Sequence, residues 1–169
     1  MDALQAIFTR RSVRHFTTQP VKPAQVETLL RAAMSAPSSG NAQPWEFAVI
    51  DERAVLDEIA AFHASGAVVQ EAQMGILVCG APAREKNPGR WVMDCANATQ
   101  NMLLAAHAIG LGAVWLGIYP DPRRMEGMTR VMCLPEGVIS VALVALGYPA
   151  ETPAQVDRFD PQRVHYNHW

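Results

Sequence analysis

The chain has 169 residues, of which 50% are hydrophobic and only 18% are charged, and its formal net charge is −2. This length suits one domain with a sizeable core. The charged fraction lies below the usual value of about a quarter, so we expect some apolar surface to meet another chain. The slightly acidic balance argues against nucleic acid or an anionic membrane as a partner, and no apolar run is long enough to cross a bilayer.

The first half of the chain alternates helical and extended patterns. The sequence predicts helices over residues 2–10, 23–35 and 52–62, strands over 46–50 and 74–79, and loops over 36–44 and 62–73. The helix over 23–35 has the clearest pattern, because its apolar residues recur at the spacing of one helical face: Val26, Leu29, Leu30, Ala33 and Met34.

The second half contains the longest predicted helix, over residues 91–109, which Gly110 is well suited to end. Apolar residues lie on most of its sides, so we expect a central helix that also packs against a second chain. The sequence further predicts a strand over 113–118, a helix over 122–132 and a strand over 138–146. The residues 148–169 form a tail with little periodicity, which we expect to wrap a neighbour. Strands separated by helices predict a layered α/β or α+β domain with helices on both faces of one sheet.

Three cysteines, Cys79, Cys95 and Cys133, are far apart and form no CxxC pair. Isolated thiols in odd number indicate a reducing compartment rather than a disulfide scaffold, and we expect them to be small buried side chains. The N-terminal residues have no apolar core of signal-peptide length, so the sequence predicts a soluble, cytoplasmic protein.

The first candidate site is a cluster of arginines with one serine, formed by Arg10, Arg11, Ser12 and Arg14. Guanidinium groups bind phosphate through a planar fork of donors and keep their charge at any working pH. The alternative is a solvated charge run at the end of a helix, where cations interact favourably with the helix dipole.

The second candidate is the loop from Pro37 to Trp45, which is rich in small hydroxyl and amide side chains. Such groups suit the polar edge of a heterocycle, although a plain surface loop has the same composition. Trp45 itself is expected in the core. The third candidate is the segment 110–119, in which Gly110, Gly112 and Gly117 permit close backbone approach by a ligand. This segment is no Rossmann site, because a helix precedes the strand and no full GxGxxG is present.

Other chemistry-bearing residues form no recognisable constellation. His165 and His168 lack a third ligand at a supporting spacing, so we predict no metal site. Asp94 is expected to be a structural polar group, and no Ser–His–Asp arrangement is present. With no catalytic acid, base or nucleophile to assign, we expect a cofactor to carry the chemistry.

The order of several motifs resembles the nitroreductase family of FMN-dependent enzymes. These motifs are RRSVRHF, APSSGNAQPWEF, WVMDCANATQNMLLAAHAIGLGAVWLGIYP, and LGYP before a tail ending in VHYNHW, and together they span essentially the whole chain. The resemblance implies a single α+β domain over residues 1–169 with three layers, α/β/α. In it a mixed, mostly antiparallel sheet lies between helices, and two chains form an intertwined homodimer with FMN at the subunit interface.

The resemblance also assigns residues to the flavin. It implies that the arginine-serine motif and a tail arginine hold the phosphate and ribityl chain, that the Pro-Ser-Ser-x-Asn loop approaches from the other subunit, and that the segment before Tyr119 lies along the ring. The cofactor-binding residues so implied are Arg10, Arg11, Ser12, Arg14, Arg158, Pro37, Ser38, Ser39, Asn41, Gln43, Leu116 and Gly117.

The activity implied is a ping-pong cycle in which NADH or NADPH gives a hydride to the flavin, and a nitroaromatic, a quinone or a similar conjugated acceptor then takes it. No side chain of the protein is assigned as a catalytic residue. Two alternatives stay open from the sequence: a flavin-binding or storage module without turnover, and a relative that dehalogenates aromatics or fragments the flavin itself.

Overall fold

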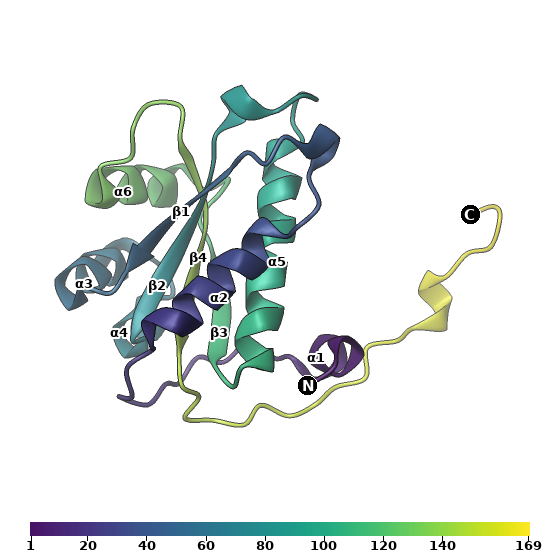
Figure 1. The fold of residues 1–169 in the computed structure, drawn as a ribbon, viewed down its shortest axis with the longest axis horizontal. Coiled ribbons are helices and arrows are strands. Elements are labelled where there is room, and N and C mark those ends of the chain that lie inside the picture. Colours follow the sequence, from purple (N-terminus) through teal and green to yellow (C-terminus); the bar gives the residue numbers. More distant parts are fainter.

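The computed structural model describes all 169 residues, and its helices and strands follow the predicted order, with one additional helix at Gly66–Glu71 (Figure 1). The helices are α1 (Ala3–Thr9), α2 (Pro23–Met34), α3 (Arg53–Phe62), α4 (Gly66–Glu71), α5 (Trp91–Ala108) and α6 (Pro122–Met132). The strands are β1 (Trp45–Ile50), β2 (Met74–Gly80), β3 (Gly112–Gly117) and β4 (Ile139–Gly147). Short 3-10 turns occupy Ser39–Asn41, Pro82–Arg84 and Pro161–Arg163.

The four strands form one sheet in the order β1-β2-β4-β3, and every neighbouring pair is antiparallel. The expectation of a mixed sheet is therefore wrong for the single chain. The physical reason is the position of β4, which lies between β2 and β3 and so separates two strands that run in the same direction. As a result β3 is an edge strand, with one side free to meet other groups.

Helices cover both faces of the sheet, which confirms the three-layer α+β fold (Figure 1). One apolar core lies between the sheet and the helices α2 and α5, and a second lies between the sheet and α3, α4 and α6. All seven residues of β2 are buried, as are all but the first residue of β4, because these central strands have helices on both faces.

Two helix boundaries follow directly from local chemistry. The Asp121 side chain accepts hydrogen bonds from the backbone N–H groups of Arg123 and Arg124 and so caps α6, as its N-cap position predicts. The chain leaves α5 at Gly110, which has a φ of 82°, a conformation that glycine adopts without strain.

Two expectations about local structure are corrected. Residues 62–73 are not a plain loop, because they contain α4, a helix of six residues that is too short to show a periodic pattern and is fixed by the burial of Val69. Cys79 and Cys95 are buried as expected, and burial raises the pKa of each thiol to about 12. Cys133 is exposed instead, because it ends α6 in a left-handed conformation away from the core.

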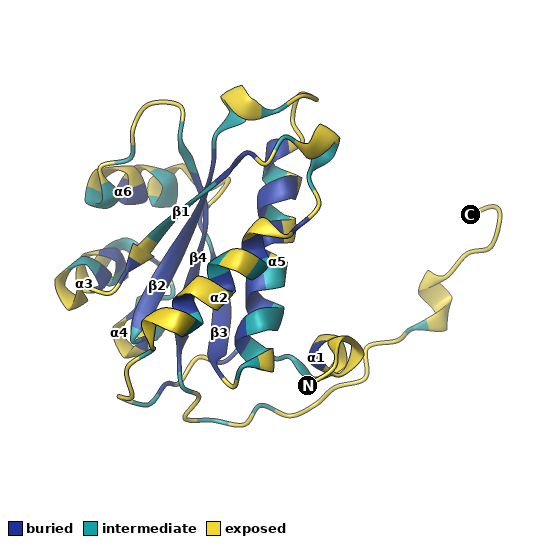
Figure 2. Ribbon diagram, viewed as in Figure 1, coloured by how far each residue is buried: buried dark blue, intermediate teal, exposed yellow.

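The tail beyond Tyr148 leaves the sheet and runs past α1 into solvent (Figure 2). Large apolar side chains are exposed on both segments, at Leu4, Ile7 and Phe8 of α1 and at Val156, Phe159, Tyr166 and Trp169 of the tail. No helix is both long enough and apolar enough to cross a membrane.

Candidate functional site

The arginine-serine segment, residues 10–14, lies along the open edge of β3. The Val13 N–H donates to the Ala113 carbonyl over 3.1 Å, and the Val13 side chain is buried. This close approach needs Gly112, since a Cβ there would lie 2.7 Å from a Val13 methyl group. The Glu151 carboxylate adds a clamp by accepting the backbone N–H groups of Arg14 (2.7 Å) and His15 (3.3 Å). The segment is thus fixed to the sheet edge while its polar side chains stay available.

The arginines of this segment carry positive charge without carboxylate partners. None of Arg10, Arg14 and Arg158 lies in an ion pair. The pKa of Arg10 is lowered, first by burial and then by repulsion from Arg11 and from Arg158 of the tail. Ligand pockets have volumes of about 300–1,000 Å³. Arg10, Arg11 and Arg158 line a cavity of about 810 Å³. Asp157 lines the same cavity, so three arginines face one carboxylate residue, and this excess of positive charge favours an anionic ligand.

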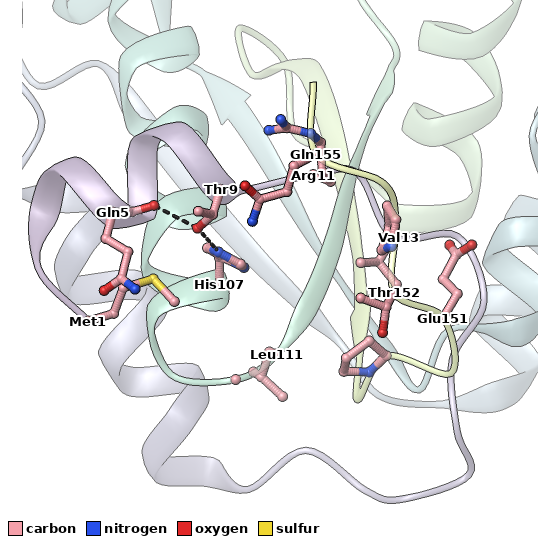
Figure 3. A pocket seen from close by; sticks show the side chains of 13 residues that line it. Met1, Gln5, Thr9, Arg11, Val13, His107, Leu111, Glu151, Thr152 and Gln155 are labelled. Atoms are coloured by element: carbon pink, nitrogen blue, oxygen red, sulfur yellow. Dashed lines mark hydrogen bonds between the residues drawn. The ribbon is translucent and has the colours of Figure 1, made fainter. Parts of the chain in front are cut away.

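Arg11 bonds the backbone of its own chain, a role that no pattern in the sequence indicates. Its guanidinium donates to four backbone carbonyls, those of Phe8, Arg10, Ala154 and Val156. It therefore fastens the tail to the end of α1. Behind it lies a second cavity of about 480 Å³ between α1, the end of α5 and the tail (Figure 3). Thr9 and His107 line this cavity, and the Thr9 hydroxyl and His107 Nε2 form a hydrogen bond of 2.8 Å.

The Pro-Ser-Ser loop is held in a specific shape at the other end of α5. Gly40, Asn41 and Gln43 have φ values of 60°, 54° and 48°, so three residues of the loop lie in the left-handed region. Asp94, in the first turn of α5, accepts the Ser39 N–H over 2.9 Å and is 4% exposed. This contact is the kind that the expectation of a structural role for Asp94 describes, while its Oδ2 atom is buried without a hydrogen-bond partner.

Further contacts fix the loop from the segment before α5. Lys86 donates to the Gly40 carbonyl over 2.7 Å, and the Asn87 amide donates to the Ser39 hydroxyl over 2.8 Å. The Ser38 hydroxyl accepts the Gln43 N–H over 3.0 Å, so its own proton stays free to be donated. Trp45, which follows the loop, is buried in the core as expected.

The third predicted segment, Leu116–Gly117, ends β3 on the same open edge. Hydrogen bonds alternate along an antiparallel strand. The Ala113 carbonyl faces the 10–14 segment and the Ile118 N–H bonds Val141 of β4, so Gly117 faces the open edge and Leu116 faces β4. Nothing lies within 4 Å of where a Cβ of Gly117 would be, which leaves room for a flat ligand.

Two side chains that the sequence did not mark as functional contact Gly117. Its carbonyl accepts hydrogen bonds from His63 (3.2 Å), at the end of α3, and from Arg124 (2.8 Å), in the first turn of α6. Burial is the main cause that lowers the pKa of His63, which is 5% exposed. In the sequence His63 is an isolated histidine and Arg124 is one of two arginines after a proline, so no local pattern identifies them.

The structure brings two of the three predicted segments together along one strand. Ala113, beside the arginine segment, and Gly117 are four residues apart on β3, or about 13 Å. The Pro-Ser-Ser loop lies at the beginning of α5, whereas α1 and the arginines lie at its end (Figure 1). An α5 of 18 residues spans about 27 Å, so one chain does not close this loop around its own arginines.

Comparison with known proteins places this arrangement in a family. The family model described as "Nitroreductase family" matches residues 7–90 and 67–148. A protein of Methanothermobacter thermautotrophicus provisionally named NADH dehydrogenase/NAD(P)H nitroreductase is 47% identical over 169 residues, which cover 100% of this chain and 88% of that protein. The chain therefore belongs to the nitroreductase family of oxidoreductases.

Solved structures agree with this assignment. A crystal structure from Bacteroides thetaiotaomicron with the same provisional name has a TM-score of 0.95 and 40% identity, covering 99% of this chain and 98% of that one. A provisionally named nitroreductase from Desulfovibrio desulfuricans, solved in complex with FMN, has a TM-score of 0.87 and 32% identity, covering 100% of this chain and 99% of that one.

Proposed function

We propose that residues 1–169 form one FMN-binding domain of an NAD(P)H-dependent oxidoreductase, and that two chains share each flavin site. The observation that carries the proposal is the open edge of β3, with partnerless arginines at one end and an empty space above Gly117 at the other. The FMN complex of the Desulfovibrio desulfuricans relative supports the same cofactor for this fold.

The residues present fit FMN in three ways. Arg10, Ser12 and Arg14, with Arg158 from the tail, supply donors for a phosphate and a ribityl chain. The Gly117 N–H, on the open edge, is placed to donate to the ring, while the buried Leu116 side chain supports the strand from the α3 and α6 side. Arg11 contributes indirectly by fastening the tail that bears Arg158.

A second copy of the chain supplies the other wall of the site in this proposal. The Pro-Ser-Ser loop lies at the beginning of α5, at the opposite end from the arginines. In the proposed dimer the loop of the partner chain reaches the β3 edge, and its contributing residues are Pro37, Ser38, Ser39, Asn41 and Gln43. The exposed apolar side chains of α1 and the tail, together with Met93 on α5, support such a homodimer. The three free cysteines support the reducing cytoplasm as its compartment.

In this function the bound FMN supplies the redox chemistry, because it accepts a hydride from NADH or NADPH and passes it to an acceptor. We propose nitroaromatics, quinones or similar conjugated electrophiles as acceptors. The chain itself orients the ring by hydrogen bonds, holds the phosphate and leaves one ring face accessible.

The function is tested by the visible spectrum of the purified protein under anaerobic conditions. We expect flavin bands that bleach on addition of NADH or NADPH and return with a nitroaromatic or a quinone. A protein that binds FMN but does not bleach would instead be a flavin-binding module. A colourless protein that takes up no added FMN would contradict the proposal as a whole.

Asp94 provides a separate test of the Pro-Ser-Ser loop. Replacing Asp94 with alanine removes the acceptor of the Ser39 N–H, so the loop loses a fixed point and we expect FMN affinity to fall about tenfold. Asp94→Asn keeps an acceptor oxygen and should stay within about threefold of the wild type. Flavin fluorescence titration measures both variants. Equal affinities of Asp94→Ala and the wild type would show that the loop needs no such support.

A further inference from the structure

The end of β3 is braced by two helices that belong to different parts of the chain. His63 lies at the end of α3, and Arg124 lies in the first turn of α6, yet both donate to the carbonyl oxygen of Gly117. A carbonyl oxygen has two lone pairs, so these donors complete its hydrogen bonding. An ordinary edge strand leaves such a carbonyl to water. His63 and Arg124, which we call the brace, therefore bond a carbonyl that water could also satisfy in a folded edge strand.

The protonation state of His63 is fixed by its neighbours. The His63 Nδ1 atom accepts the Ser65 N–H over 3.0 Å, so the ring proton lies on Nε2 and is donated to Gly117. Burial lowers the pKa of this imidazole and outweighs the hydrogen bond to Gly117, which raises it; Arg124 lowers the pKa further, and Asp121 raises it. A neutral ring with one acceptor and one donor nitrogen holds a single orientation.

Arg124 is also held by a neighbour. Its Nε atom pairs with the Asp121 carboxylate over 3.3 Å, and its side chain is 32% exposed. Asp121 also caps α6, so the position of the guanidinium is tied to the beginning of the helix. The two bracing helices touch nearby, because a Cβ at Gly127 of α6 would lie 2.6 Å from the Phe62 ring of α3.

We propose that His63 and Arg124 are positioning residues, which hold the Gly117 carbonyl so that the Gly117 N–H points at the flavin ring. In a β-strand the N–H and C=O of one residue point to the same side, so a carbonyl held in place favours the strand conformation that directs the N–H to that side. This inference rests on the proposed function, because it assigns the brace to the ring end of the same site. It gives α3 and α6 a role in orienting the cofactor. Neither helix contains a residue of the motifs that carry the family resemblance.

The test compares variants that remove a donor with variants that keep one. His63→Leu and Arg124→Met each remove a hydrogen bond to Gly117, and we expect FMN affinity to fall about tenfold in each. His63→Gln keeps a donor near the Nε2 position and should restore most of the affinity. Arg130→Met is the matched control, because it removes an exposed charge from the same helix without touching Gly117.

A second measurement does not depend on FMN. Amide hydrogen exchange of the flavin-free protein at Ile118 and Tyr119, whose N–H groups bond the Val141 carbonyl, should speed up about tenfold in His63→Leu and Arg124→Met relative to Arg130→Met. Affinity and exchange at the level of the control would overturn the inference. A wild-type protein that binds no FMN would overturn the proposed function, and with it the flavin-orienting role, even if the exchange result shows that the brace exists.

Discussion

Replacing Arg10 and Arg14 together with alanine is expected to weaken FMN binding about a hundredfold or more, because each guanidinium is assigned to the phosphate end of the site. The pKa of Arg10 is lowered by burial and by repulsion from Arg11 and Arg158, so this charge is unfavourable in the absence of an anion. We therefore expect the flavin-free double variant to unfold at the same temperature as the wild type or higher. Fluorescence titration measures the affinity, and thermal unfolding without FMN measures the stability.

The control for this prediction is Arg31→Ala, which removes an exposed charge that is already paired with Glu27 on α2. It should bind FMN like the wild type. The affinity difference between the arginine variant and this control should shrink as salt rises, since the contact is electrostatic. Unchanged FMN affinity in the double variant would remove Arg10 and Arg14 from the site.

The second prediction concerns the space above Gly117. A valine at this position meets no atom within 4 Å at its Cβ and suits a strand, so the flavin-free protein should keep its stability. The same side chain would occupy the volume assigned to the ring. We expect FMN affinity to fall between about tenfold and a hundredfold, the range of typical overpacking costs. Equilibrium dialysis against FMN measures the loss.

Gly112→Ala is the informative comparison, since this glycine lies at the other end of the same strand. Its new methyl group would contact Val13 at 2.7 Å and push the arginine segment away from β3. Here both folding stability and FMN affinity should fall, with a stability loss of about 1–3 kcal/mol. If Gly117→Val also lowered stability by this amount, or left FMN binding intact, the space above Gly117 would not be the ring site.

Much of the fold was predictable because its signals are local. The apolar face of α2, the cap of α6 at Asp121 and the stop of α5 at Gly110 are each set by a few neighbouring residues. The strand order was not predictable, since the insertion of β4 between β2 and β3 depends on packing over the whole chain. The helix α4 was missed because its six residues are held by tertiary contacts rather than by a periodic pattern.

The residues of the candidate site likewise divide into those that a local sequence pattern marks and those that only the fold brings together. The arginine segment and the Pro-Ser-Ser loop are short runs of distinctive residues, so they could be singled out from the sequence. His63, Arg124 and Glu151 act through single hydrogen bonds to backbone groups far away in the chain. Any histidine, arginine or glutamate would have looked the same before the structure placed it. The fold determines which backbone groups these side chains bond, and no pattern in the sequence indicates them.

The central claim is that each flavin site takes its arginines from one chain and its Pro-Ser-Ser loop from the other. A mixed dimer tests it directly, with Arg10→Ala and Arg14→Ala in one chain and Ser38→Ala and Asn41→Ala in its partner. Each parent homodimer should bind FMN weakly. If the site is shared, one of the two sites in the mixed dimer regains all wild-type groups, and flavin content should recover to about half that of the wild type. Failure to recover any binding would place both elements of a site in the same chain and contradict this account.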